Sequence, residues 1–313
     1  MQPERRGLRP SRAAATPDDA LDPIEIRTDD GVALRGDVRE PPARERVGVA
    51  VLAHAMMARR SEFERPHGGG LARFLASRGW RTIAFDFRGH GDSGQDAASG
   101  GSWTYDDLVR RDLPAVVACA RARAKKLPVV VIGHSLGGHV ALAAQGTGRI
   151  DANAIVGIAS NVWLRELEPS RTRWALKRAT MAFVGALCER RGYFPARVLR
   201  AGSDDEAVAY FAALQRCVAT GRWTSDDGTE DYLAALANVT RPVMSIASDS
   251  DLLNCRPICA ELFHARCAGK KEIDRIRRAD DGGAPPGHME IVTTERAKSA
   301  WARMELWLRE VTR

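Results

Sequence analysis

Hydrophobic and polar positions alternate near the start of the chain and then give way to longer apolar runs. Residues 24–41, IEIRTDDGVALRGDVREP, alternate on both sides of Asp30-Gly31, which predicts a β-hairpin with a tight turn. The run RVGVAVLAHA at residues 46–55 is almost wholly apolar, which is typical of a strand buried on both faces. The pattern therefore predicts an antiparallel start that leads into a buried sheet.

Apolar runs and helix-like segments then follow one another along the chain. We expect further strands at residues 81–87, 128–135, 151–160, 240–249 and 271–278, and helices at residues 70–78, 105–125, 136–145, 258–267 and 295–311. Strands separated by helices imply a mostly parallel central sheet with helices on both faces. The predicted fold class is therefore α/β.

The periodicity divides the chain into three regions. Residues 1–22 are rich in Arg, Pro, Asp and Ala, and we expect a disordered tail there. Residues 161–238 show helix-like segments without a convincing strand, which predicts an α-helical insertion that covers one edge of the sheet. Residues 23–160 and 239–313 would then form the α/β core.

Composition narrows the classes of function. The net charge is +7 with 28% charged residues, but the basic residues are scattered among Asp and Glu without an aromatic reading motif, so we expect no nucleic-acid partner. No segment is apolar enough for a signal peptide or a membrane span, so we expect a cytoplasmic protein. The six cysteines lack the C-x-x-C spacing of a zinc or dithiol site and are read as free thiols.

The most informative stretch is VVVIGHSLGGHVALAAQG, residues 129–146, where a β-branched run enters a helix through the pattern G-x-S-x-G. A strand that turns sharply into a helix at this motif displays a strained serine, here Ser135. So tight a turn requires residues without a Cβ atom, and Gly133, Gly137 and Gly138 meet this requirement. We expect Ser135 to be a nucleophile.

A serine hydroxyl needs a base to take its proton and a third group to orient that base. After this type of elbow, the acid and the histidine follow the serine in the chain, on loops after late strands. Asp249 and Asp251 follow the apolar strand of residues 240–249, and His288 follows the loop GGAPPG. The order of nucleophile, acid and base is thus available, with two candidates for the acid.

These motifs resemble the α/β-hydrolase superfamily, in which a late strand ends in small-x-x-Asp. Placing Ser248 at the small position implies that Asp251 is the acid, with Asp249 as the alternative. DFRGHGDSG at residues 86–94 is similar to the loop that braces the first active-site loop in this superfamily, which implies a structural role for Arg88 and His90. Three further features resemble a bacterial branch described as serine-aminopeptidase-like, namely GHSLGGH, GYFP at residues 192–195 and the Trp, Asp-Asp, Tyr spacing over residues 223–232.

An oxyanion hole needs two backbone N–H groups that point at the negative charge of the tetrahedral intermediate. The residue after the nucleophile, Leu136, is expected to supply one of them. The resemblance to the superfamily's His-Gly-x loop implies Met56 for the other. Ala55 stands where that loop has glycine, so Met57 is a second possibility.

The resemblance and the motifs together predict a serine hydrolase that cleaves a carboxylic ester through an acyl-enzyme. Nine aromatic residues between 163 and 232 suit a small, apolar substrate. The alternatives are a thioesterase or acyltransferase with the same triad, and a non-catalytic protein that binds a ligand in the same pocket. No metal-ligand set or phosphate loop is present, so we expect no cofactor and no metal. The sequence does not specify the oligomeric state.

Overall fold

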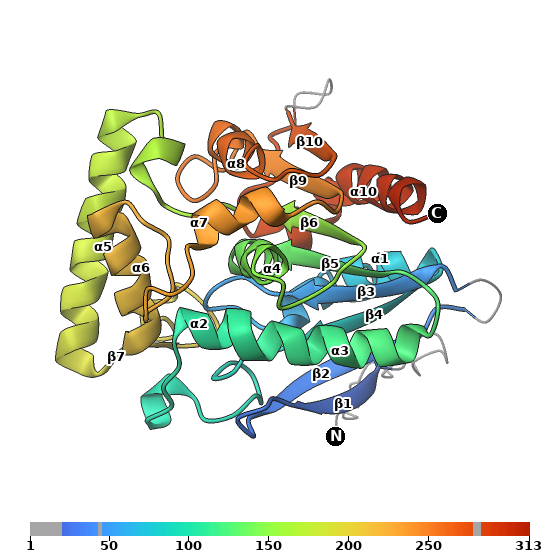
Figure 1. Cartoon of the computed structure of the whole chain (residues 1–313), viewed down its shortest axis with the longest axis horizontal. Helices are drawn as coiled ribbons and strands as arrows, with labels where there is room; N and C mark the ends of the chain where they lie inside the picture. The colour runs from blue at the N-terminus through green and yellow to red at the C-terminus, as the bar shows by residue number, and fades with distance from the viewer. Residues whose placement is uncertain (1–20, 43–45, 278–282) are drawn as a thin grey trace, which may run out of the picture.

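The computed structural model describes residues 21–42, 46–277 and 283–313 and shows an eight-stranded sheet (Figure 1). The strand order is β1-β2-β4-β3-β5-β6-β9-β10. β1 pairs antiparallel with β2 and β2 antiparallel with β4, whereas all other pairs within this sheet are parallel. The expected mostly parallel α/β fold is therefore confirmed.

The strands of this sheet correspond closely to the apolar runs of the sequence. They are β1 (Asp22–Arg27), β2 (Ala33–Arg39), β3 (Gly48–Ala53), β4 (Trp80–Phe85), β5 (Val129–His134), β6 (Ala154–Ile158), β9 (Val243–Ser248) and β10 (Lys271–Ile276). The predicted tail lies outside the described residues as far as residue 20, and its last residue, Asp22, is already the first residue of β1.

Helices cover both faces of the sheet. They are α1 (Leu71–Ser77), α2 (Tyr105–Asp107), α3 (Leu113–Ala124), α4 (Leu136–Gly146), α8 (Pro257–His264), α9 (Glu290–Thr293) and α10 (Lys298–Val311). The single helix expected at 105–125 is divided, because a π-helical turn at Leu108–Asp112 separates α2 from α3. α3 and α4 lie on the face that is turned toward the viewer in Figure 1.

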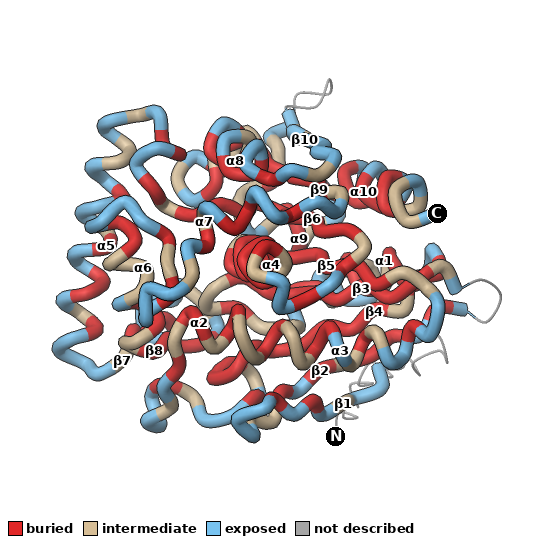
Figure 2. Tube along the Cα trace, viewed as in Figure 1, coloured by how far each residue is buried: buried red, intermediate tan, exposed pale blue. Residues whose placement is uncertain are grey.

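The hydrophobic core has two layers, one on each face of the sheet. On β3, Val49 and Val51 pack into the layer beneath α3 and α4, while Ala50 and Leu52 pack into the layer with α1 and α10. This division follows from the period of two along a strand. Every residue of β3 and of β5 is buried, as expected for central parallel strands (Figure 2).

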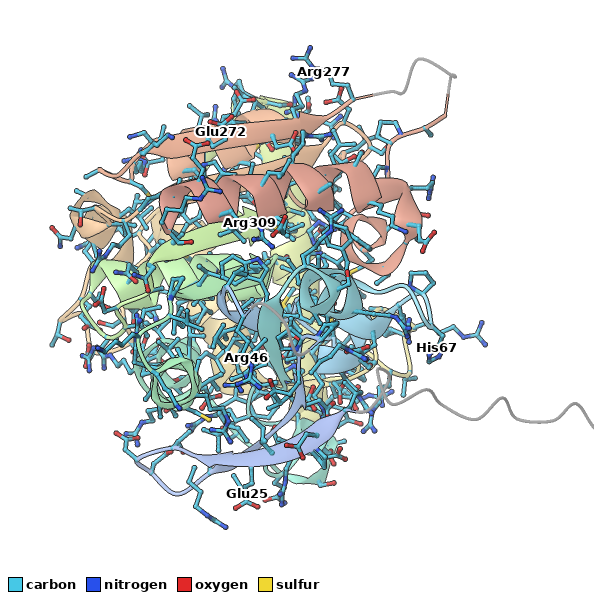
Figure 3. All side chains as sticks on the ribbon, turned by 90° about the vertical axis from the view of Figure 1, so that its right-hand side faces the viewer. Glu25, Arg46, His67, Glu272, Arg277 and Arg309 are labelled. Atoms are coloured by element: carbon cyan, nitrogen blue, oxygen red, sulfur yellow. The ribbon has the colours of Figure 1, made fainter. Side chains whose placement is uncertain are left out.

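The sheet has two exposed edges. Figure 3 shows the side chains of Glu25 on β1 and Glu272 on β10 at opposite ends of the molecule. Charged side chains along these edges disfavour pairing with a strand of another chain. Among the described residues, no helix has the length and apolar character that a membrane crossing requires.

The segment of residues 161–238 connects β6 to β9. It contains α5 (Arg171–Arg191), α6 (Val208–Thr220) and α7 (Tyr232–Ala235), and α5 and α6 lie side by side beyond one end of the sheet (Figure 1). Two strands of two residues each, β7 (Tyr193–Phe194) and β8 (Glu206–Ala207), also pair in this segment, although no strand was expected there. Pairs this short leave too weak a pattern in the sequence to be predicted.

Candidate active site

Ser135 occupies the turn between β5 and α4 with a backbone φ of 49° and ψ of −109°. A positive φ is uncommon for a residue with a side chain and stores strain. The close packing around it explains the glycines: a Cβ on Gly133 would lie 2.2 Å from the Gly137 carbonyl carbon, and one on Gly137 would lie 2.1 Å from the Ala53 carbonyl oxygen. The strained elbow that the sequence predicts is present.

His288 and Asp251 meet beside this turn. The Nδ1 atom of His288 lies 2.5 Å from Oδ2 of Asp251, and the other carboxylate oxygen accepts the backbone N–H of Asn254 at 3.0 Å. Burial alone would raise the pKa of Asp251, but the hydrogen bond and charge of His288 and the N–H groups of Cys255 and Asn254 hold it below its ordinary value. Asp251 is therefore an ionised partner for His288.

Asp249, the alternative acid, does not reach His288. Its Oδ1 accepts a hydrogen bond of 2.6 Å from Nε of Arg275, a residue of β10. This carboxylate is partly exposed, whereas Asp251 is buried. The structure thus brings one of the two candidate acids to the histidine.

Ser135 and His288 line the same cavity. Within the described part of the chain no hydrogen bond joins the Ser135 side chain to His288. The backbone of Ser135 is fixed from both sides, because its N–H donates to Ile158 O at 2.8 Å and its carbonyl accepts from Ser160 Oγ at 2.8 Å. The serine therefore has a rigid backbone and a side chain that faces open space.

The two expected oxyanion donors lie on the wall of this cavity. Leu136 is the first residue of α4, and among the described residues neither its N–H nor that of Met56 donates to a protein acceptor. The N–H of Met57, the second possibility, is engaged, since it donates to Oε1 of Glu206 at 2.8 Å. Of the three N–H groups considered, those of Leu136 and Met56 are thus available to a ligand.

The loop at residues 54–58 has its positive φ at a different residue from the one where the superfamily's loop has glycine. Ala55 does not take a left-handed conformation, whereas Met57 does, with a φ of 59°. The peptide groups around Met57 are held by the 161–238 segment: Glu206 accepts its N–H, and its carbonyl accepts the N–H of Ser203 at 2.8 Å. Hydrogen bonds from residues 203–206 therefore stabilise the positive φ of Met57, a conformation that glycine would adopt more easily.

Glu206 is a residue of the site that sequence analysis missed. Its side chain is fully buried, and Oε1 also lies 3.0 Å from Nε2 of His90. Burial would lower the pKa of His90, but the charge and hydrogen bond of Glu206 raise it to about 9. The pair is therefore ionic, and His90 has the structural role expected of it. Glu206 lies in a segment without a motif, so no pattern marked it.

His134 and Glu62 form a second link that the sequence did not reveal. The Nδ1 atom of His134 lies 3.0 Å from Oε1 of Glu62, and Nε2 lies 3.0 Å from the backbone oxygen of His288. Glu62 also accepts the N–H of Ala55 at 3.1 Å. Both ring nitrogens of His134 face oxygen acceptors, which is the arrangement of a protonated imidazole. Through this link the loop that carries Met56 is connected to the backbone of His288.

The histidine in the loop at residues 54–58, His54, is neutral. His54 is fully buried, its Nδ1 lies 2.7 Å from Ala55 O, and its Nε2 accepts the N–H of Phe87 at 3.0 Å. Burial, with the charge of His90 acting in the same direction, lowers the pKa of His54 to about 3. His54 therefore supports the loop as a neutral donor and acceptor.

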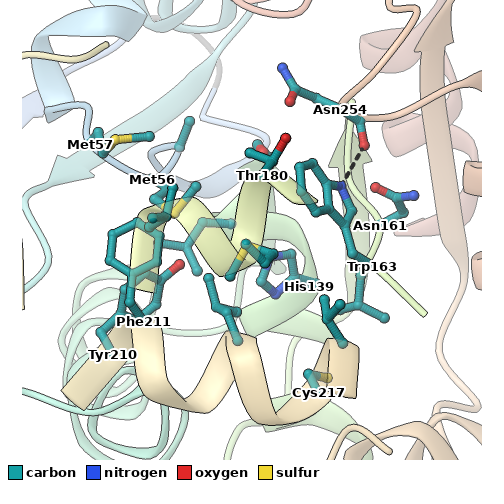
Figure 4. A pocket seen from close by; sticks show the side chains of 18 of the residues that line it. Met56, Met57, His139, Asn161, Trp163, Thr180, Tyr210, Phe211, Cys217 and Asn254 are labelled. Atoms are coloured by element: carbon teal, nitrogen blue, oxygen red, sulfur yellow. Dashed lines mark hydrogen bonds between the residues drawn. The ribbon is translucent and has the colours of Figure 1, made fainter. Parts of the chain in front are cut away.

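The cavity has a volume of about 360 Å³ and mostly apolar walls (Figure 4). Five of the nine aromatic residues noted in the 161–238 segment line it: Trp163, Phe194, Tyr210, Phe211 and Trp223. Of the other four, Phe183 is exposed and Tyr232 is buried with its hydroxyl on Asp106. Aliphatic side chains and sulfur atoms complete the wall, among them Met56, Met181, Leu214 and Cys217.

The eight-stranded sheet and the strained serine between β5 and α4 define an α/β-hydrolase fold. The chain belongs to the alpha/beta hydrolase family, whose model matches residues 50–297. The superfamily resemblance of the sequence is thereby confirmed, while the narrower serine-aminopeptidase-like branch stays a prediction.

Solved structures of esterases and a lipase share this fold. A soluble variant of monoglyceride lipase from Saccharomyces cerevisiae is 19% identical, with a TM-score of 0.70, over 98% of this chain and 100% of that chain. A thermophilic esterase from Thermogutta terrifontis is 16% identical, with a TM-score of 0.61, over 93% and 100%. An esterase from Pyrococcus furiosus is 19% identical, with a TM-score of 0.61, over 96% of both chains. A comparison with curated proteins finds no match.

Proposed function

We propose that the chain is a serine hydrolase that cleaves carboxylic esters of small, apolar substrates. The observation that carries the proposal is the arrangement around one cavity: Ser135 at a strained elbow, His288 on the same wall, and a buried Asp251 at 2.5 Å from the far nitrogen of that histidine. Nucleophile, base and orienting acid are the three parts that acyl transfer to serine requires. The esterase and lipase structures with the same fold are consistent with this chemistry.

In the proposed mechanism, Ser135 Oγ attacks the ester carbonyl carbon while Nε2 of His288 takes the hydroxyl proton. Asp251 accepts a hydrogen bond from Nδ1 of His288 and stabilises the charged imidazole that forms. The proton then passes from Nε2 to the leaving alcohol, and an acyl-enzyme is left. Water, activated by His288 in the same way, releases the acid. The mechanism requires Ser135 Oγ and His288 Nε2 to approach within hydrogen-bond distance when substrate binds, as catalytic hydrogen bonds commonly do.

The tetrahedral intermediate needs donors for its oxygen anion. We assign the N–H groups of Leu136 and Met56 to this role, because both lie on the cavity wall and neither has another acceptor among the described residues. The dipole of α4 adds to the field at Leu136, since its amino end points toward the site.

We further propose that residues 161–238 form a cap over the catalytic serine. Trp163, Met181, Tyr210 and Trp223 of this segment line the cavity that also contains Ser135. The cap would hold the apolar part of the substrate and exclude water from the reacting carbonyl. A thioesterase or acyltransferase would use the same groups with another leaving group or acceptor.

A fluorophosphonate probe tests the proposal, because it reacts covalently with an activated serine. Wild-type protein is expected to become labelled at Ser135, and the Ser135→Ala variant is expected to stay unlabelled. Both proteins should then be compared on p-nitrophenyl esters of increasing chain length, where wild-type is expected to show an optimum. A folded wild-type protein that is neither labelled nor active would contradict the proposal and favour a non-catalytic ligand-binding role.

A further inference from the structure

His139 is a polar residue on the cavity wall that the proposed triad does not use. His139 lies on α4 one helical turn after Ser135, and its backbone N–H donates to the Ser135 carbonyl at 3.4 Å. His139 and Ser135 line the same cavity, so the imidazole of His139 belongs to the wall around the nucleophile.

The ring of His139 is packed against two aromatic residues. Tyr105 stacks on it with ring centroids 5.6 Å apart and an angle of 21°, and Trp223 meets it edge to face at 6.1 Å. Only 8% of the residue is exposed, and His139 is one of the side chains that line the cavity (Figure 4). Its orientation is therefore fixed before any substrate binds.

A hydrogen bond from Tyr105 selects the tautomer of this ring. The Tyr105 hydroxyl lies 2.9 Å from Nδ1 of His139 and has no other partner in the part of the chain that the structure describes. If Nδ1 carried the proton, the buried hydroxyl hydrogen of Tyr105 would lack an acceptor, which is costly. Tyr105 therefore donates to Nδ1, and the single proton of the neutral ring is on Nε2.

The protonation states agree with this assignment. Burial raises the pKa of Tyr105 well above its ordinary value, and burial lowers the pKa of His139 to about 3. At neutral pH His139 is thus an uncharged ring whose Nε2–H has no hydrogen-bond acceptor among the described residues. Nε2 of His139 is not fully buried, and a donor on a cavity wall that has no protein partner is suited to an acceptor on a ligand.

We propose that His139 Nε2–H is a specificity-determining donor, and that the substrates are esters with an ether, ketone or hydroxyl oxygen on the part that enters the cavity. This inference rests on the proposed function and adds a substrate class to it. A wholly alkyl group would leave the donor of His139 unpaired, whereas a group with an acceptor a few bonds from the scissile carbonyl would satisfy it. Discrimination by a donor on the cavity wall is stronger than discrimination by apolar shape alone.

Isosteric ester pairs test the proposal. On the acyl side, p-nitrophenyl 3-methoxypropanoate is compared with p-nitrophenyl pentanoate; on the alcohol side, 2-methoxyethyl butyrate is compared with butyl butyrate. Within each pair an oxygen replaces one methylene group. Wild-type protein is expected to prefer the ether of one pair, and that pair identifies the part of the substrate that enters the cavity.

The ether preference is the ratio of kcat/KM for the ether ester to kcat/KM for the alkyl ester. His139→Phe should reduce this ratio about tenfold, which corresponds to a loss of about 1.4 kcal/mol. His139→Gln retains an N–H donor and should keep part of the preference. Met181→Leu changes an apolar wall residue and should affect both esters of a pair alike. Tyr210→Phe removes another hydroxyl from the wall, so loss of the preference in that variant instead of His139→Phe would overturn the assignment.

Nitrogen NMR and fluorophosphonate labelling test the tautomer of His139 and the hydrolase function independently of the ester pairs. Nitrogen NMR of the wild-type protein is expected to show His139 protonated on Nε2 and not on Nδ1, and the opposite tautomer would overturn the proposal without any variant. Fluorophosphonate labelling of Ser135 separates the two levels of inference. Labelling with an unchanged ether preference in His139→Phe refutes only the role of His139, whereas absence of labelling in wild-type protein refutes the hydrolase function itself.

Discussion

The backbone N–H of Met57 donates a hydrogen bond of 2.8 Å to the carboxylate of Glu206, a residue 149 positions later in the chain. Met57 follows Met56, the proposed oxyanion donor, and Glu206 belongs to the proposed cap. The same carboxylate oxygen lies 3.0 Å from Nε2 of His90. One buried ion pair therefore connects the cap, the loop at residues 54–58 and the loop at residues 86–94.

Replacing Glu206 with Gln is expected to lower kcat about tenfold or more and to change KM little. The amide keeps the shape of the side chain but loses the charge that holds His90, so the peptide beside Met56 shifts and the oxyanion donor moves. Removing a donor of this kind outright costs about 10²- to 10³-fold in kcat, which sets the upper limit for a displacement. Steady-state kinetics on the best p-nitrophenyl ester provides the measurement.

Glu189→Gln is the matched control, since Glu189 is an exposed carboxylate on α5 of the same segment. Its kinetic constants should equal those of wild-type protein. If Glu206→Gln also behaved like wild-type, the ion pair would have no part in positioning the loop.

The raised pKa of His90 predicts a particular dependence of stability on pH. An ordinary histidine titrates near 6.5 and His90 at about 9, so between these values the folded protein holds a proton that the unfolded chain has released. The free energy of unfolding should therefore fall as the pH rises from 6.5 through 9, by about 3 kcal/mol in total from this group. Urea titrations of wild-type protein and Glu206→Gln at several pH values measure it. The difference between the two curves should shrink as the pH rises, and a constant difference would refute the ionic pairing.

The sequence predicted those parts of the site that depend on local chemistry. A strand that runs into G-x-S-x-G has few alternatives, so the position of Ser135 followed from neighbouring residues alone. The order of elements along the chain placed Asp249, Asp251 and His288 on late loops, and the preference for Asp251 came from the resemblance to the superfamily. The elbow and the ends of these strands are each determined within about ten residues, where periodicity and turn chemistry are informative.

The contacts that support the site could not be predicted in the same way. Glu206 reaches Met57 and His90, and Glu62 reaches His134, across long stretches of chain without any shared motif. Such pairs depend on how loops from different strands meet at the edge of the sheet. The division of the helix at 105–125 by a π-helical turn was missed as well, and it lies just before Pro114, which has no N–H for the helical hydrogen-bond ladder.

The two neighbouring carboxylates after β9 provide a test of the acid in the proposed triad. Asp251→Asn is expected to lower kcat by about 10⁴-fold, because the amide favours the wrong tautomer of His288 and cannot stabilise the charged ring. Asp249→Asn loses only its bond to Arg275 on the surface and should retain wild-type activity. Both variants should be tested for kcat and for labelling by the fluorophosphonate. Equal losses in the two variants would show that the region is needed for folding and not Asp251 for catalysis.

The packing at the elbow predicts a large difference between two glycine substitutions. In Gly137→Ala the new Cβ would lie 2.1 Å from the backbone oxygen of Ala53, so β3 and α4 must separate. Overpacking of this kind costs about 1–3 kcal/mol or more, and the movement would displace Leu136 together with Ser135. Gly148→Ala meets nothing within 4 Å and is opposed only by its φ of +73°, so it should cost about 1 kcal/mol. In Gly137→Ala the midpoint temperature of thermal unfolding and the rate of fluorophosphonate labelling should both fall. Gly148→Ala should show a small loss of stability and an unchanged labelling rate. A Gly137→Ala protein that labels as fast as wild-type would mean that the elbow does not depend on the close approach of α4 to β3.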